Sequence, residues 1–157
     1  MEEINRLRVG KQAREYLLSY TDKFDFAATL TFKYAITDRI SAQMVGKQFT
    51  NRYNSAMGYN NFRKRKDPSK RALMITMLEG DGKNEHLHYH MALKKPEHMS
   101  HAEFWFLTQK SWVRTKSGGT DQNVIKPIDD ENWVDYITKQ VGHFSVDKID
   151  WENTHIY

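Results

Sequence analysis

Alternating apolar and polar positions along the chain predict two β-strands. Over residues 25–32, large apolar side chains share one face and small side chains share the other: Phe26, Ala28, Leu30 and Phe32 against Ala27, Thr29 and Thr31. Over residues 86–93, three histidines and an alanine face away from four larger side chains: His86, His88, His90 and Ala92 against Leu87, Tyr89, Met91 and Leu93. In the second strand, the apolar face can pack into a core while the imidazole face meets a ligand.

A third strand is predicted by the continuous apolar run over residues 71–79, which ends in Glu79. A run without alternation is typical of a central strand that is covered on both faces. Turn-forming residues 80–84 follow, so this strand and the histidine strand form a predicted hairpin that brings Glu79 close to the histidines. Residues 123–128 predict one more short strand, which Pro127 ends or places at an edge.

Helical spacing of apolar residues predicts helices over residues 2–20, 41–57, 100–114 and 130–141. Gly10 interrupts the first and favours two short pieces instead of one helix. In the last helix, a tyrosine, a lysine, a glutamine and a histidine form a stripe at helical spacing: Tyr136, Lys139, Gln140 and His143. Such a stripe is commonly just an amphipathic surface.

Capping residues mark the ends of two of these helices. Ser41 or Asp38 is a suitable N-cap of the second helix, and Gly58 is a suitable C-cap. Ser100 followed by Glu103 has the pattern of a capping box at the start of the third helix.

Composition limits the class of protein. The chain has 157 residues, which suits one domain with a core, and it contains no cysteine. Disulfides and thiolate metal sites are therefore excluded, and a reducing compartment fits. No apolar run is long enough for a transmembrane helix, the first residues lack the pattern of a signal peptide, and no phosphate-binding P-loop motif is present.

Charge is distributed unevenly along the chain, although the net charge is only +4. Six basic residues and one acid, Asp67, fall within residues 63–71, whereas residues 129–152 carry seven acids and two lysines. A basic cluster is commonly a solvated surface, but phosphate backbones also bind there through counterion release. Aromatic residues in the loop over residues 58–70 suit stacking with single-stranded bases.

The histidine strand is a candidate metal site, because imidazole is a common ligand of divalent transition metals. Glu79 is a natural third ligand if the hairpin forms. The alternative for the histidines is packing or solubility, and the alternative for Glu79 is a surface position at a strand end. The threonine face of residues 25–32 would leave room for a substrate strand if it adjoins the histidine face.

Three segments occur in an order that resembles the HUH (His-hydrophobic-His) superfamily of single-strand DNA endonucleases, in its one-tyrosine rolling-circle replication initiator (Rep) branch. They are Thr29-Leu30-Thr31-Phe32, then His88-Tyr89-His90 preceded by Glu79, then Tyr136-Ile137-Thr138-Lys139. The resemblance spans roughly residues 25 to 144, and its specificity comes from the order of three short motifs.

The resemblance implies a role for each matching residue. Tyr136 would attack a scissile phosphate in single-stranded DNA, giving a 5′-phosphotyrosine link and a free 3′-OH. The histidine pair would hold Mn²⁺ or Mg²⁺, and Lys139 would act near the phosphate. An acidic third ligand eight or nine positions before the first histidine favours His88 and His90 with Glu79, although His86 and His88 also fit the motif and His86 could reach the ion.

The resemblance also implies the fold and the partners. We expect a single α+β domain over residues 1–157, with its core at about 22–144, in which helices flank a central antiparallel sheet related to the ferredoxin-like and RNA-recognition folds. No helicase domain is expected in the chain, so either the chain is a nuclease fragment or the full protein uses a host helicase. A host helicase and polymerase are the expected partners in the second case. The expected ligand is single-stranded DNA with an origin hairpin, contacted by seven residues: Thr29, Thr31, Arg63, Lys64, Arg65, Lys66 and Gln140.

Two alternatives to a replication initiator remain open. A one-tyrosine HUH transposase or a relaxase would use the same chemistry on another DNA target. A non-catalytic RNA-recognition-like module would bind nucleic acid by stacking on sheet aromatics, where this sequence instead predicts threonines and histidines. No membrane association is expected, and the location is the cytoplasm for a bacterial or phage protein or the nucleus for a eukaryotic virus protein.

Overall fold

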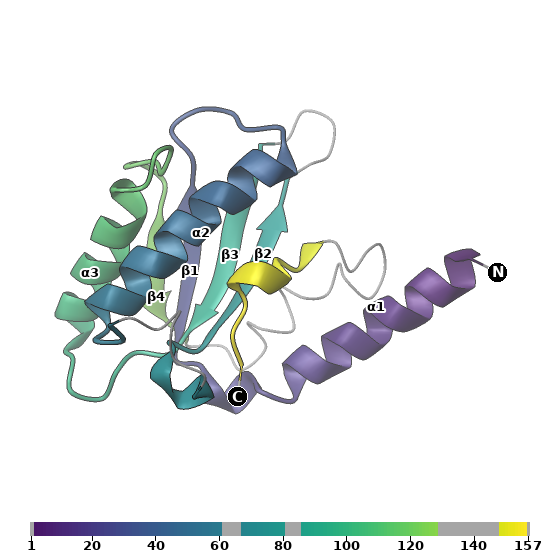
Figure 1. Cartoon of the computed structure of the whole chain (residues 1–157), viewed down its shortest axis with the longest axis horizontal. Helices are drawn as coiled ribbons and strands as arrows, with labels where there is room; N and C mark the ends of the chain where they lie inside the picture. Colours follow the sequence, from purple (N-terminus) through teal and green to yellow (C-terminus); the bar gives the residue numbers. More distant parts are fainter. Residues whose placement is uncertain (1, 61–66, 81–85, 129–147, 157) are drawn as a thin grey trace.

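A four-stranded antiparallel sheet lies at the centre of the computed structural model, which describes residues 2–60, 67–80, 86–128 and 148–156 (Figure 1). Its strands are β1 (Phe26–Thr31), β2 (Met74–Glu79), β3 (His88–Leu93) and β4 (Val124–Pro127), in the order β2-β3-β1-β4. β2 and β3 form the expected antiparallel hairpin pair. The expected α+β fold with a central antiparallel sheet and flanking helices is confirmed.

Two helices, α2 (Arg39–Ala56) and α3 (His101–Val113), cover one face of the sheet (Figure 1). The main core lies between them and the sheet. It takes large side chains from the sheet and from both helices, among them Leu30, Leu78, Tyr89, Phe49 and Trp112. Each apolar face that the alternating pattern predicts points into this layer, because burial of apolar surface is the main favourable term in folding.

The opposite face of the sheet is covered only in part. Leu17, at the end of α1 (Glu2–Leu18), packs with Phe24, Ile75, Met77, Ala92 and Ile149 in a second, smaller cluster. Beyond this cluster, Thr29, Thr31 and the histidines of β3 lie on the same face and are only partly buried. The fold therefore leaves a polar region on the sheet beside a covered one.

The helix ends confirm most of the capping predictions. The Asp38 side chain accepts hydrogen bonds from the backbone N–H groups of Ile40 and Ser41, so Asp38 is the N-cap of α2. Gly58 follows the C-cap Met57 and has a φ of 93°, the left-handed conformation that favours glycine there. Ser100 accepts from the N–H of Glu103 at the start of α3.

The prediction that Gly10 divides the first helix is wrong, because α1 is continuous from Glu2 to Leu18. An interior glycine costs only about 1 kcal/mol relative to alanine. The residues that follow it, 11–15, are good helix formers and maintain the helix. Among the described residues, no helix combines the length and the apolar character that crossing a membrane requires.

One prediction about the position of a strand also needs correction. β2 is the outermost strand in the sheet order instead of a central one, yet residues 74–78 are buried. Residues 149–155 run along its outer side, with isolated bridges from Met74 to His155 and from Met77 to Ile149. This C-terminal segment therefore provides the cover that the apolar run of β2 requires.

Candidate metal centre

Strand register brings the predicted ligands together. β3 lies between β2 and β1, and its His88 is paired with Glu79 on one side and with Thr31 on the other. His90 is paired with Thr29. Paired residues of antiparallel strands share a face, so all these side chains lie on the face opposite α2 and α3. The condition that the threonine face adjoins the histidine face is met.

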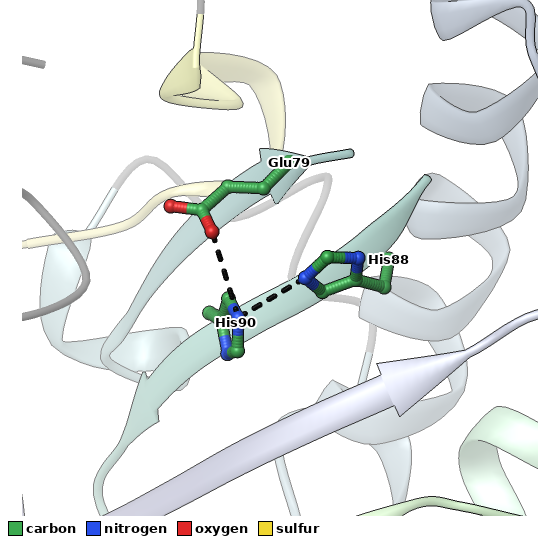
Figure 2. A group of neighbouring side chains, drawn as sticks. All are labelled: Glu79, His88 and His90. Carbon is green, nitrogen blue, oxygen red and sulfur yellow. Dashed lines mark hydrogen bonds and ion pairs between the residues drawn. The ribbon is translucent and has the colours of Figure 1, made fainter. Parts of the chain in front are cut away.

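Three donor atoms converge at this point, one each from Glu79, His88 and His90 (Figure 2). All three lie within 4.8 Å of one another. The Nε2 atoms of His88 and His90 are 3.1 Å apart, and His90 Nε2 is 3.5 Å from Glu79 Oε2. The side chains of His90 and Glu79 are 15% and 16% exposed, so the group is largely shielded but reachable from solvent.

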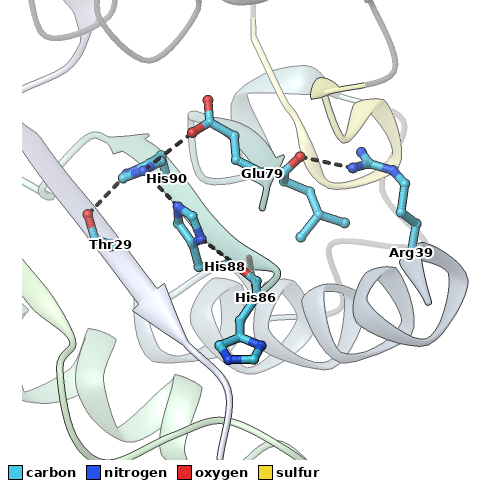
Figure 3. A network of polar contacts seen from close by, with 7 residues as sticks. Thr29, Arg39, Glu79, His86, His88 and His90 are labelled. Atoms are coloured by element: carbon cyan, nitrogen blue, oxygen red, sulfur yellow. Dashed lines mark hydrogen bonds and ion pairs between the residues drawn. The ribbon is translucent and has the colours of Figure 1, made fainter. Parts of the chain in front are cut away.

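The other nitrogen of each imidazole has a partner of its own (Figure 3). His88 Nδ1 lies 3.0 Å from the backbone carbonyl oxygen of His86, and His90 Nδ1 lies 3.1 Å from Thr29 Oγ1. A carbonyl oxygen only accepts, so Nδ1 of His88 carries the proton and Nε2 presents a lone pair. Such partners are typical of metal-ligating histidines, because they fix the ring and its tautomer.

His90 is neutral at physiological pH. Burial, with a smaller contribution from the neighbouring His88, lowers the pKa of His90 to about 4. A neutral imidazole offers the lone pair that metal coordination requires. The group therefore brings together electron-rich atoms that need a positive centre between them, either a proton or a metal ion.

The observed separations fit a shared ion. Two nitrogen ligands at about 2.1 Å from one ion lie about 3.0–3.4 Å apart for octahedral or tetrahedral angles. The separation of the His88 and His90 nitrogens falls in that range. Two imidazoles and one carboxylate make a mixed nitrogen and oxygen donor set, which suits divalent first-row metals. The Glu79, His88 and His90 group could therefore hold a metal ion.

His86 does not join this group. β3 begins at His88, so the predicted strand over residues 86–93 is two residues too long at its start. His86 is exposed and contributes its backbone carbonyl to His88 instead of its ring. The structure therefore brings together the preferred pair, His88 and His90, with Glu79.

For three residues near the site, the sequence analysis predicted no role in the site itself. Asn123 accepts hydrogen bonds from the N–H and the hydroxyl of Thr31, at 2.9 and 3.1 Å, and so ties β1 to the segment before β4. Arg39 donates to the carbonyl oxygen of Leu78, next to Glu79 (Figure 3). Gly80, with a φ of 97°, follows Glu79 at the end of β2. Only the glycine gave a signal in the sequence, as part of the predicted turn.

Several predicted site residues lie outside the described residues. These are the candidate nucleophile and its neighbours, and the basic loop: Tyr136, Lys139, Gln140, Arg63, Lys64, Arg65 and Lys66. Their predicted roles stay predictions. Thr29 and Thr31 are described, and they border the metal group on the side of β1.

Comparison with protein-family models, with curated proteins and with solved structures finds no match to this chain. The resemblance to HUH endonucleases therefore depends on the three motifs. The fold and the site define an α+β protein with a candidate divalent-metal centre on the open face of its sheet.

Proposed function

We propose that the chain is a metal-dependent, site-specific single-stranded DNA nicking and joining enzyme of the HUH type, which initiates rolling-circle replication. The observation that carries the proposal is the convergence of Glu79, His88 and His90 beside the threonine face of β1. Two histidines separated by one apolar residue, with an acid from the neighbouring strand, are the arrangement that the motif resemblance requires.

Mn²⁺ or Mg²⁺ is the proposed cofactor. Imidazole ligands suit transition metals, and a carboxylate with open positions suits both Mn²⁺ and Mg²⁺. When bound, the ion supplies Lewis-acid polarisation of a phosphoryl oxygen. Glu79 and the two histidines would hold it, while the hydroxyl of Thr29 and the carbonyl of His86 orient the rings.

Tyr136 is the proposed nucleophile. Its phenolic oxygen forms a bond to the scissile phosphorus, and the bond from phosphorus to the 3′ oxygen breaks. The phenolic proton passes to a base, and the 3′ oxygen leaves and takes up a proton to become a free 3′-OH. A phenol of ordinary pKa near 10 is mostly protonated at neutral pH, so nearby positive charge from Lys139 would favour the reacting form.

The phosphotyrosine conserves the energy of the original phosphodiester, so the same site can rejoin the strand. The single strand would cross the face of β1, where Thr29 and Thr31 provide small polar side chains. Residues 63–66 and Gln140 would add contacts to the origin hairpin, and a host helicase and polymerase would extend the free 3′-OH.

A cleavage assay tests this proposal. The protein is incubated with a pool of single-stranded oligonucleotides, including candidate origin hairpins, with Mn²⁺ or with EDTA, and run on denaturing gels. We expect a covalent protein–DNA adduct that needs metal and is lost in Tyr136→Phe. Tyr34→Phe is the matched control, because Tyr34 is 71% exposed and lies outside the site. Tight binding of an origin hairpin without any adduct would favour a non-catalytic binding module instead.

A further inference from the structure

A concave surface lies on the helical side of the protein, away from the candidate metal centre. It is a hollow of about 520 Å³ between α2 and α3. Three basic residues line it: Arg52 on α2, Lys110 on α3, and Arg114 at the C-cap of α3. Since α2 and α3 cover the sheet face opposite Glu79, His88 and His90, the sheet separates this α2–α3 groove from the candidate metal centre (Figure 1).

The charge of the α2–α3 groove has one sign. No carboxylate is among the residues that line it. In the part of the chain that the structure describes, Arg52, Lys110 and Arg114 form no ion pair with an acid. Lys110 and the C-cap residue Arg114 are one helical turn apart, so they lie next to each other at the end of α3. Like charges gathered in a concavity attract an anion from solution.

The polar groups of the groove match those that contact phosphate. Arginine presents a planar fork of donors that fits two phosphate oxygens, and lysine adds a point charge. The exposed Ser55 adds a hydroxyl beside Arg52. Arginine, lysine and serine are among the residues that proteins place against the phosphates of nucleic acids.

Other anions fit the groove less well. Only Ala56 and Leu107 are apolar among its lining residues, which offers no large apolar pocket for an acidic peptide to anchor in. No aromatic side chain lines it, so a single nucleotide would find no surface on which to stack its base. A sugar-phosphate backbone, held by charge and hydrogen bonds alone, matches the available chemistry.

We propose that the α2–α3 groove binds the phosphodiester backbone of a nucleic acid, independently of base sequence and of the metal centre. This goes beyond the proposed nicking activity and does not depend on it. A nucleic acid held there would contact the face opposite the candidate metal centre, so the protein would engage its ligand on two sides of the sheet.

Fluorescence anisotropy with a labelled single strand of mixed sequence tests this proposal in EDTA, over a range of salt concentrations. The test variant is Arg52→Gln with Arg114→Gln. The control is Arg8→Gln with Lys11→Gln, which removes the same charge from exposed positions on α1. For the test variant we expect roughly tenfold weaker binding and a salt slope smaller by about 1.4, at about 0.7 for each lost phosphate contact. We expect little change for the control.

Two further measurements distinguish the groove from general charge. Arg52→Lys with Arg114→Lys should retain the salt slope and recover most of the affinity, since it retains both charges. A labelled glutamate peptide serves as the second anion. Equal losses in test and control variants, no loss in the test variant, or a loss confined to the glutamate peptide would each overturn the proposal. Thermal unfolding of every variant confirms that the fold is retained.

Discussion

The hydroxyl of Thr29 decides the orientation of an imidazole one strand away. It lies 3.1 Å from His90 Nδ1, and this contact leaves His90 Nε2 directed at His88 and Glu79. Register places Thr29 beside His90, but alternation alone did not predict which threonine would do this. At this scale, the candidate metal centre consists of its three donors and of the two groups that orient them.

Replacing Thr29 by valine should weaken metal binding without unfolding the protein. Valine has a similar shape but no hydroxyl, so the His90 ring loses a partner that orients it. Loss of such a partner typically costs 10–100-fold in metal affinity, and we expect about tenfold here. Titration calorimetry with Mn²⁺ measures the change. Thr37→Val, at an exposed position before α2, is the control, and equal affinity in both variants would contradict the role of Thr29.

A change to one of the three donor residues should lower metal affinity more than Thr29→Val does. His88→Ala removes one of three donors and Glu79→Gln removes the negative charge of another, so we expect Mn²⁺ affinity to fall more than in Thr29→Val. His86→Ala is the matched control, because its ring lies outside the donor group and only its backbone carbonyl contacts His88. A loss in His86→Ala as large as in His88→Ala would show that the His86 ring is a ligand.

The β2–β3 pair is the element on which the candidate metal centre depends. Gly80, directly after Glu79, has a φ of 97°. A Cβ atom at this position would overlap the carbonyl oxygen of His86, the group that holds His88. The glycine therefore permits the close approach that positions both strands of the site.

Gly80→Ala should therefore damage metal binding, whereas Gly58→Ala should not. Both glycines have positive φ, so each alanine adds strain of about 1–2 kcal/mol to the folded state. Only at Gly80 does the new methyl group displace the backbone of the site, because a Cβ at Gly58 meets nothing within 4 Å. Calorimetry with Mn²⁺ and urea unfolding separate the two effects. Equal metal affinity in the two variants would contradict this role of Gly80.

The sequence predicted those elements whose pattern is local. Alternation in β1 and β3, the cap at Ser100 and the hairpin with Glu79 depend on residues near one another in the chain. The edge position of β2 did not follow, because its cover comes from residues 149–155, far away in the sequence. Asn123 was missed for the same reason, since its partner Thr31 is 92 residues away.

For the whole molecule, metal binding should raise stability by mass action. An ion that binds only the folded state at about 100 times its dissociation constant adds about 2.7 kcal/mol. For a chain of this size, that corresponds to an increase in Tm of roughly 5–10 °C. Differential scanning fluorimetry with Mn²⁺ and with EDTA measures it. The increase should be absent in His88→Ala, and its persistence there would place the bound ion elsewhere.

A buried carboxyl group should make stability depend on pH. Burial raises the pKa of Asp150, although the Tyr89 hydroxyl and Asn153 donate hydrogen bonds to it. Between its ordinary pKa and the raised value, the folded state binds more protons than the unfolded state. The free energy of unfolding therefore decreases as pH rises through this window, and the cost is complete above it.

Asp150→Asn should remove this dependence. We expect the wild-type protein to gain stability relative to Asp150→Asn as pH is lowered from neutral toward the ordinary carboxyl pKa. Urea unfolding at a series of pH values measures the difference. Glu97→Gln, at an exposed position, should show no comparable trend, and a flat difference for Asp150→Asn would contradict the raised pKa.

Because residues 149–155 cover β2, this strand stays uncovered during much of the synthesis of the chain. Thr76 of β2 bonds to Asp150, which is synthesised 74 residues later. Until then, the outer side of an apolar strand is open to pairing with another chain, the usual starting point of edge-to-edge aggregation. A chain whose synthesis stops before residue 149 would thus expose the unpaired edge of β2. Chaperones that bind exposed strands would be needed most in the interval before residues 149–155 are made.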